Sequence, residues 1–267
     1  MEKFQSYFDF YVKSSIHVAL MVLCMYQISI IELKLSSSIE LSLFVFLGTL
    51  FAYNFVKYNY LFFNSFEGQK LVPKRIFILS CLSLIFSVYL FFSLNLLEMS
   101  ITIIASFLLF LYIIPFYNKK YNLRTIEGLK IHIVASCWTL VTLILPLINT
   151  IDFFSSSTWV LIIQRYLWII LAILPFEIFD SQMDSEELLT IPQFLGVSKT
   201  KLLGIFLSLI IVFISFVGSS NFWFAYLLMA ILYVYFLCST SIDQSPYRNL
   251  FWVEAIPFLG WLSLYLY

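Results

Sequence analysis

Three acidic residues lie close together in the stretch ILPFEIFDSQMDSEELLT, at the end of a long apolar run. Glu177, Asp180 and Asp184 are spaced i, i+3 and i+7, so on a continuous helix they share one face. Asp180 and Asp184 repel each other at this spacing, unless a bound cation or a basic partner offsets the repulsion. Carboxylates are also ligands that Mg²⁺ prefers. The stretch indicates either a cation-binding face or a solvated acidic loop at an exit from a membrane.

A second polar group interrupts the aromatic stretch GTLFAYNFVKYNYLFFN, which contains Asn54, Lys57 and Tyr58. Lys57 either extends along the helix to the membrane interface or turns inward toward a ligand. Arg165, beside Gln164, is a further charge at membrane depth, where each charge costs about 2.5–3.5 kcal/mol. We expect Arg165 to extend to the interface or to pair inside the bundle, and we assign it no role.

The composition indicates that the helices carrying these residues lie in a membrane. Of the 267 residues, 62% are apolar, 20% are aromatic and only 11% are charged, whereas soluble domains are about 45–50% apolar. These values exclude an ordinary cytosolic enzyme, a disordered chain and a secreted disulfide scaffold. The net charge of zero argues against nucleic-acid binding. The chain has four cysteines, Cys24, Cys81, Cys137 and Cys238, and none of them forms a C-x-x-C pair. We therefore expect these cysteines to be small buried hydrophobic side chains rather than ligands of a zinc ion.

The apolar segments predict an all-α, polytopic membrane bundle that forms a single domain over residues 1–267. A membrane-spanning helix needs about 20 mostly apolar residues. The first apolar run follows no small-residue cleavage site, so we expect it to be a retained span. Nine candidate spans follow from this count: 14–31, 40–61, 76–95, 99–117, 129–149, 158–179, 200–218, 221–239 and 250–267.

The basic residues predict the orientation, because cytoplasmic loops are rich in Lys and Arg. If the nine spans alternate, only Lys34 falls on the opposite side from the other basic loop residues. The N-terminus and the three longer loops, 62–75, 118–128 and 180–199, are then cytoplasmic, and the C-terminus is outside. We expect a bacterial plasma membrane. The twelve residues on the cytoplasmic side are Lys3, Lys13, Lys70, Lys74, Arg75, Lys119, Lys120, Arg124, Lys130, Lys199, Lys201 and Arg248.

The N-terminal residues predict a short helix at the membrane interface, because Phe4, Phe8 and Tyr11 share one helical face. Pro175 precedes the acidic residues by about one turn and removes a backbone hydrogen bond, so we expect the sixth span to kink there.

The two cytoplasmic polar groups together resemble the UbiA superfamily of intramembrane prenyltransferases. In that family a D-x-x-x-D motif ends the sixth helix and is followed by a Thr, small residues and a Gly, which is similar to EIFDSQMDSEELLTIPQFLGVSKTKLLG. The stretch LYIIPFYNKKYNLRTIEGLKIHIVA is also similar to the family's fourth loop. The first family motif, N-D-x-x-D-x-x-x-D, is reduced here: Asn54 is kept, but Phe55, Tyr58 and Phe62 stand where the three Asp would be.

The resemblance implies nine helices around a central cavity that opens to the cytoplasmic side. It implies a transferase that moves a polyprenyl group from an allylic diphosphate to a lipophilic, often aromatic, acceptor. Mg²⁺ neutralises the charge of the diphosphate leaving group in such chemistry. By resemblance, Asp180 and Asp184 are the catalytic and metal-binding residues. The expected substrate-binding residues are Asn54, Lys57, Tyr58, Arg124, Lys130 and Glu177.

Two alternatives to an active transferase stay open. One is a non-catalytic member that binds an isoprenoid or quinone-like lipid or a partner protein, which the missing first motif makes plausible. The other is a small transporter, which ranks last because the polar residues gather at one face and the chain has only 7 Gly and 7 Pro. In either UbiA-like case, we expect Lys57 to reach Asp180 or Asp184, unless it extends to the headgroups.

The first testable prediction concerns topology. A reporter fused after Tyr267 should lie outside, and one fused after Glu187 should lie in the cytoplasm, as read by alkaline phosphatase and fluorescent-protein activity. If both fusions report the same side, the number of spans is wrong.

Overall fold

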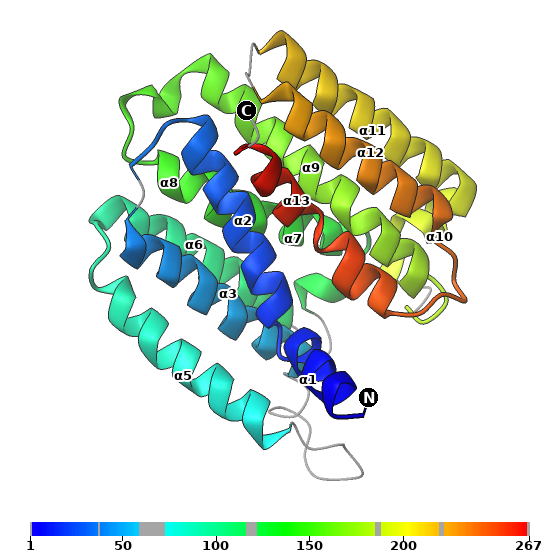
Figure 1. Ribbon diagram of the computed structural model, residues 1–267, viewed down its shortest axis with the longest axis horizontal. Coiled ribbons are helices and arrows are strands. Elements are labelled where there is room, and N and C mark those ends of the chain that lie inside the picture. Colours follow the sequence, from blue (N-terminus) through cyan, green and yellow to red (C-terminus); the bar gives the residue numbers. More distant parts are fainter. Residues whose placement is uncertain are drawn as a thin grey trace.

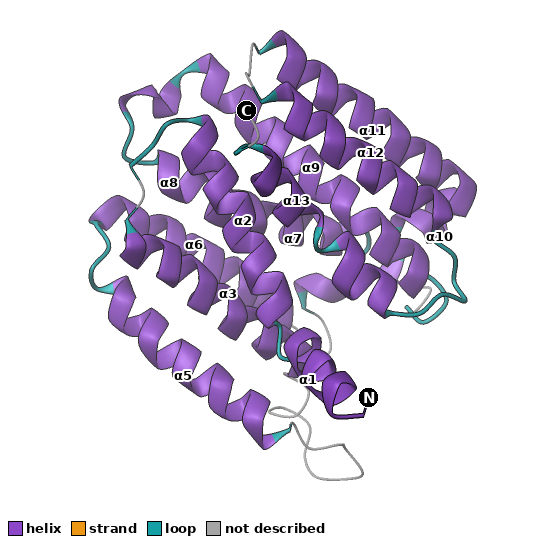
Figure 2. Ribbon diagram, viewed as in Figure 1, coloured by secondary structure: helices purple, strands orange, loops and turns teal. Residues whose placement is uncertain are grey.

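The computed structural model describes residues 2–36, 38–58, 73–115, 122–184, 188–218 and 222–265, and the regular structure in these residues is helical, without strands (Figure 2). The all-α prediction is confirmed. Phe62, Glu187, most of the predicted loop 62–75 and residues 118–121 of the predicted loop 118–128 lie outside the described residues.

Each predicted span overlaps a helical segment to within a few residues. The N-terminal segments are α1 (Glu2–Lys13), α2 (Ile16–Glu32), α3 (Ile39–Tyr58), α5 (Lys74–Phe91) and α6 (Leu96–Ile113). The central segments are η1 (Leu123–Thr125), α7 (Leu129–Thr139), η2 (Leu140–Ile144), α8 (Leu145–Leu147), η3 (Ile151–Phe154) and α9 (Ser156–Asp180). The C-terminal segments are α10 (Ile191–Leu195), α11 (Val197–Val217), α12 (Trp223–Ser239), η5 (Arg248–Val253) and α13 (Ile256–Ser263).

Six of these segments are long and apolar enough to cross a membrane. They are α3, α5, α6, the continuous segment 129–147, α9 and α11. Helices α1 and α2 make a seventh if the pair, bent by 56°, counts as one span, and α12 is apolar but shorter. The chain is therefore a multi-pass membrane protein by the length and composition of its helices, while nine spans and their orientation remain predictions.

The helices follow one another around the molecule by pairwise packing. Helix α5 packs on α3, α3 on α2, α2 on α13, α13 on α12 and α12 on α11; α11 then packs on α9, α9 on α7 and α7 on α6. Figure 1 shows α3, α5 and α6 on one side and α11 and α12 on the other, with α2, α9 and α13 between them. The close approach of α11 and α12 uses Gly204, since a Cβ there would overlap Leu237.

A buried arginine joins three helical segments in the interior. Arg165 of α9 is 4% exposed, and its guanidinium donates to the Met25 carbonyl at 2.9 Å and to Ser29 Oγ at 2.9 Å. Ser29 Oγ in turn donates to the Thr142 carbonyl at 2.7 Å. Pro146 has no N–H to offer this carbonyl four residues before it, so the serine replaces the missing bond. Of the two alternatives for Arg165, the structure shows pairing inside the bundle.

The expected kink at Pro175 does not interrupt α9, which is helical over all of its 25 residues. The cysteines are free of disulfides among the described residues, as expected. The prediction that all four are buried is wrong, because Cys238 is exposed and the other three are half-buried. Cys238 lies in the last turn of α12, at the periphery of the helical ring, where a small apolar side chain can face lipid.

Candidate functional site

The acidic face at the end of α9 is paired with a lysine from α7. Lys130 Nζ lies 3.0 Å from Glu177 Oε1 and 2.9 Å from Asp184 Oδ2. The Glu177 side chain is only 3% exposed, and those of Lys130 and Asp184 are 18% and 16% exposed. A buried carboxylate is costly unless it is paired, so Lys130 supplies the basic partner that the acidic spacing requires. We call Glu177, Asp180, Asp184, Lys130 and Arg124 the charged cluster.

Short backbone bonds hold the members of the charged cluster in place. The Asp184 N–H donates to the Asp180 carbonyl at 2.9 Å, which extends the last turn of α9. The Gln193 side chain of α10 donates to the Asp184 carbonyl at 3.2 Å. The Gly128 N–H, just before α7, donates to the Leu188 carbonyl at 3.1 Å. These bonds tie the loop after α9 to the start of α7, which carries Lys130.

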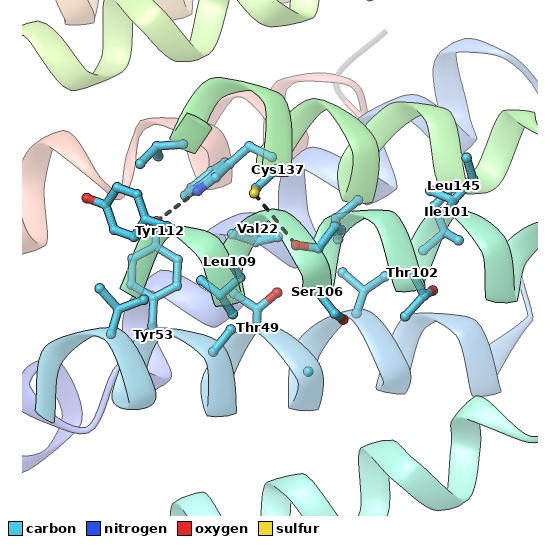
Figure 3. A pocket seen from close by; sticks show the side chains of 18 of the residues that line it. Val22, Thr49, Tyr53, Ile101, Thr102, Ser106, Leu109, Tyr112, Cys137 and Leu145 are labelled. Atoms are coloured by element: carbon cyan, nitrogen blue, oxygen red, sulfur yellow. Dashed lines mark hydrogen bonds between the residues drawn. The ribbon is translucent and has the colours of Figure 1, made fainter. Parts of the chain in front are cut away.

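An apolar cavity of about 280 Å³ lies between α3 on one side and α6 and α7 on the other. Figure 3 shows Tyr53 and Tyr112 at one end of this cavity and Ile101, Thr102 and Leu145 at the other. The Trp138 indole donates to Tyr53 Oη at 2.8 Å, so neither ring is free to fill the space. Small side chains leave the room that the cavity occupies: Gly48, Thr49 and Ala52 on α3, and Ala105 and Ser106 on α6.

The cavity ends next to the charged cluster. Tyr112 lines the cavity and lies within electrostatic range of Arg124, Lys130, Glu177 and Asp184. Ile133 and Val134, one turn after Lys130, also line the cavity. An elongated amphipathic molecule could therefore place its apolar part in the cavity and its polar end beside Tyr112 and Lys130.

The charged cluster does not have the form of a metal site. No group of three or more His, Cys, Asp or Glu side chains in the part of the chain that the structure describes could hold a metal ion. The Lys130 ammonium instead lies between Asp184, one of the two predicted ligands, and Glu177. Two unit charges about 4 Å apart repel by about 4 kcal/mol at an effective dielectric constant of about 20, and a divalent ion doubles this. Mg²⁺ at Asp180 and Asp184 remains a prediction, and this geometry does not fit it.

Lys57 and Tyr58 contact the end of α1 instead of the expected site. Lys57 Nζ donates to the Lys13 carbonyl at 3.2 Å, and Tyr58 Oη donates to the same oxygen at 3.0 Å. This carbonyl ends α1, where the helix dipole is negative and the last carbonyls lack helical partners. Among the described residues, Lys57 forms no ion pair with Asp180 or Asp184 within 4.0 Å. Both donors act on α1 because the end of α3 meets the α1–α2 bend.

Asn54 and Arg124 complete the list of expected site residues. Asn54 is 2% exposed and donates to Ser80 Oγ of α5 at 2.9 Å, while its own side-chain oxygen has no hydrogen-bond partner among the described residues. It therefore lies between α3 and α5 and not among the residues that line the cavity. Arg124 is exposed on η1 and lies within electrostatic range of Asp180.

The sequence analysis missed the cavity residues Tyr53, Tyr112 and Trp138. A signal for them exists in the sequence: Gly48 and Ala52 are one turn apart among bulky aromatics, and Thr102 and Ser106 are one turn apart on the facing span. Small residues at helical spacing mark a place where apolar bulk is missing, but which helices face each other there depends on the fold.

Comparison of the chain with family models, with curated proteins and with solved structures finds no match. The resemblance to the UbiA superfamily therefore rests on the motifs of the sequence.

A second prediction follows from the contact of Lys57 and Tyr58 with α1. The variant Lys57→Met combined with Tyr58→Phe removes both donors to the Lys13 carbonyl. Each hydrogen bond contributes about 0.5–1.5 kcal/mol net, so the loss of both should make hydrogen exchange in residues 2–13 about 5–160-fold faster. Lys74→Met, at an exposed lysine, is the control. Unchanged exchange in α1 would show that the two residues do not hold this helix.

Proposed function

We propose that this chain is a UbiA-like membrane protein that binds an isoprenoid lipid. The observation that supports this proposal is the apolar cavity, which ends at Tyr112, within electrostatic range of the charged cluster. Ligand sites are commonly apolar clefts with a few polar groups that fix orientation. In this proposal the polyprenyl chain lies between α3 and α6, and its polar end lies beside Lys130.

The resemblance also implies a reaction, the transfer of the polyprenyl group from an allylic diphosphate to a lipophilic acceptor. In that case Asp180 and Asp184 would serve catalysis with Mg²⁺, and Lys130 and Arg124 would contact the diphosphate. The second candidate is a non-catalytic protein that binds the same class of lipid. The ion pairs of Lys130 with Glu177 and Asp184 favour this candidate, because they offset part of the charge of the acidic face without a metal.

The third prediction tests lipid binding by filling the cavity. Gly48 lines the cavity, and a Cβ placed there meets no atom within 4 Å. Gly48→Phe should therefore keep the protein folded but exclude the lipid. Native mass spectrometry of protein purified in mild detergent, with extraction and identification of bound lipid, should find an isoprenoid lipid on the unmodified protein and less than a tenth as much on the variant.

The matched control is Leu43→Phe, which adds a ring on the exposed face of the same helix, where Leu43 is 46% exposed. This variant should retain the lipid. Recovery of phospholipid alone from the unmodified protein, or equal isoprenoid content in Gly48→Phe, would contradict the proposal.

The fourth prediction separates the two candidates. For a transferase, polyprenyl diphosphate binds in a Mg²⁺-dependent manner, and Asp180→Asn abolishes this binding while the protein stays folded. Asp243→Asn, at an exposed loop residue, is the control. Binding that persists in Asp180→Asn contradicts the role of Asp180, and absence of Mg²⁺-dependent binding in the unmodified protein supports the non-catalytic candidate.

A further inference from the structure

Lys130 occupies the space that a cation would need in order to bind the acidic face. Its Nζ lies 3.0 Å from Glu177 and 2.9 Å from Asp184, two carboxylates that come from α9 and from the loop after it. An ammonium carries three N–H donors, and these two ion pairs use two of them. Among the described residues these two pairs leave the third donor for another acceptor.

The charges around Lys130 decide which ligand can approach. The charged cluster contains three carboxylates and two basic groups, which gives a net charge of −1 when all are ionised. A bare diphosphate would meet this negative charge, and a divalent cation would have to displace Lys130 from both carboxylates. An uncharged oxygen adds no charge and needs only a hydrogen bond, which Lys130 and the Tyr112 hydroxyl can supply. Burying a neutral polar group costs little when it is hydrogen-bonded.

We propose that Lys130 takes the place of a divalent cation in this protein, so that the site binds an uncharged lipid oxygen without metal. The ligand class is an isoprenoid alcohol or an isoprenoid ketone, such as a quinone carbonyl, with its chain in the cavity. The absence of metal follows from the ion pairs alone, whereas the identity of the ligand rests on the proposed function.

The fifth prediction tests the metal directly, with Mn²⁺ as the probe and electron paramagnetic resonance as the measurement. The unmodified protein and Lys130→Arg should bind no Mn²⁺ up to about 1 mM, the weak end of the dissociation constants of protein Ca²⁺ sites. Lys130→Met leaves the carboxylates without their counter-ion and should gain at least tenfold in Mn²⁺ affinity. Adding Glu177→Gln and Asp184→Asn to Lys130→Met should abolish that gain.

Binding of Mn²⁺ to the unmodified protein, lost in Glu177→Gln with Asp184→Asn, would overturn the inference. This test of the unmodified protein does not depend on whether Lys130→Met folds. If Lys130→Met fails to fold, Lys130→Gln serves as the second variant in which Mn²⁺ affinity should increase.

The identity of the ligand is tested by the rate at which Cys137, whose thiol lines the cavity, is alkylated. In a variant with Cys24, Cys81 and Cys238 replaced by Ala, farnesol should slow alkylation of Cys137 without Mg²⁺ by at least threefold, and farnesyl diphosphate with Mg²⁺ should slow it less. Stronger protection by the diphosphate with Mg²⁺ would overturn the inference but leave lipid binding intact. Protection by neither would contradict the proposed function itself, while the Mn²⁺ result would still decide the question of the metal.

Discussion

The buried guanidinium of Arg165 is the interaction on which the interior of this bundle depends. It joins α9 to α2, and Ser29 extends the contact to the Thr142 carbonyl next to Pro146. In a membrane every backbone carbonyl needs a partner inside the protein, and leaving one buried polar group unpaired costs about 1–3 kcal/mol. These bonds hold α2 against η2 and α9.

Three lysines in the described part of the chain stabilise helix ends or carboxylates. Lys57 donates to the end of α1, and Lys201 donates to the Cys238 and Thr240 carbonyls at the end of α12, at 2.7 Å and 2.8 Å. Lys130 pairs with two carboxylates. All three use a flexible stem to bring a cation to an oxygen that the fold leaves without a partner. A lysine near a membrane exit therefore need not extend to the headgroups, and here it joins elements distant in sequence.

The cavity ends near the charged cluster because three elements meet close to their ends. Tyr112 ends α6, Lys130 begins α7, and the acidic residues end α9. The bond from the Gly128 N–H to the Leu188 carbonyl fixes the two loops beside each other, and the bond from the Gln193 side chain to the Asp184 carbonyl holds the loop after α9. The apolar part of the site is thus built from helix interiors, which are rigid, and the polar part from helix ends, where side chains can change partners.

The sequence by itself determined the helical class, the membrane location and the positions of the helices, because apolar runs of about 20 residues have few alternatives. It also placed Glu177, Asp180 and Asp184 on one face, because their spacing is local. The tertiary structure alone decided their partner: Lys130 is 47 residues from Glu177 in sequence and 54 from Asp184, and Lys57 was an equally good candidate by type. Which lysine reaches the acids depends on how α3, α7 and α9 pack, and that packing is set by long-range contacts that spacing along the chain does not encode.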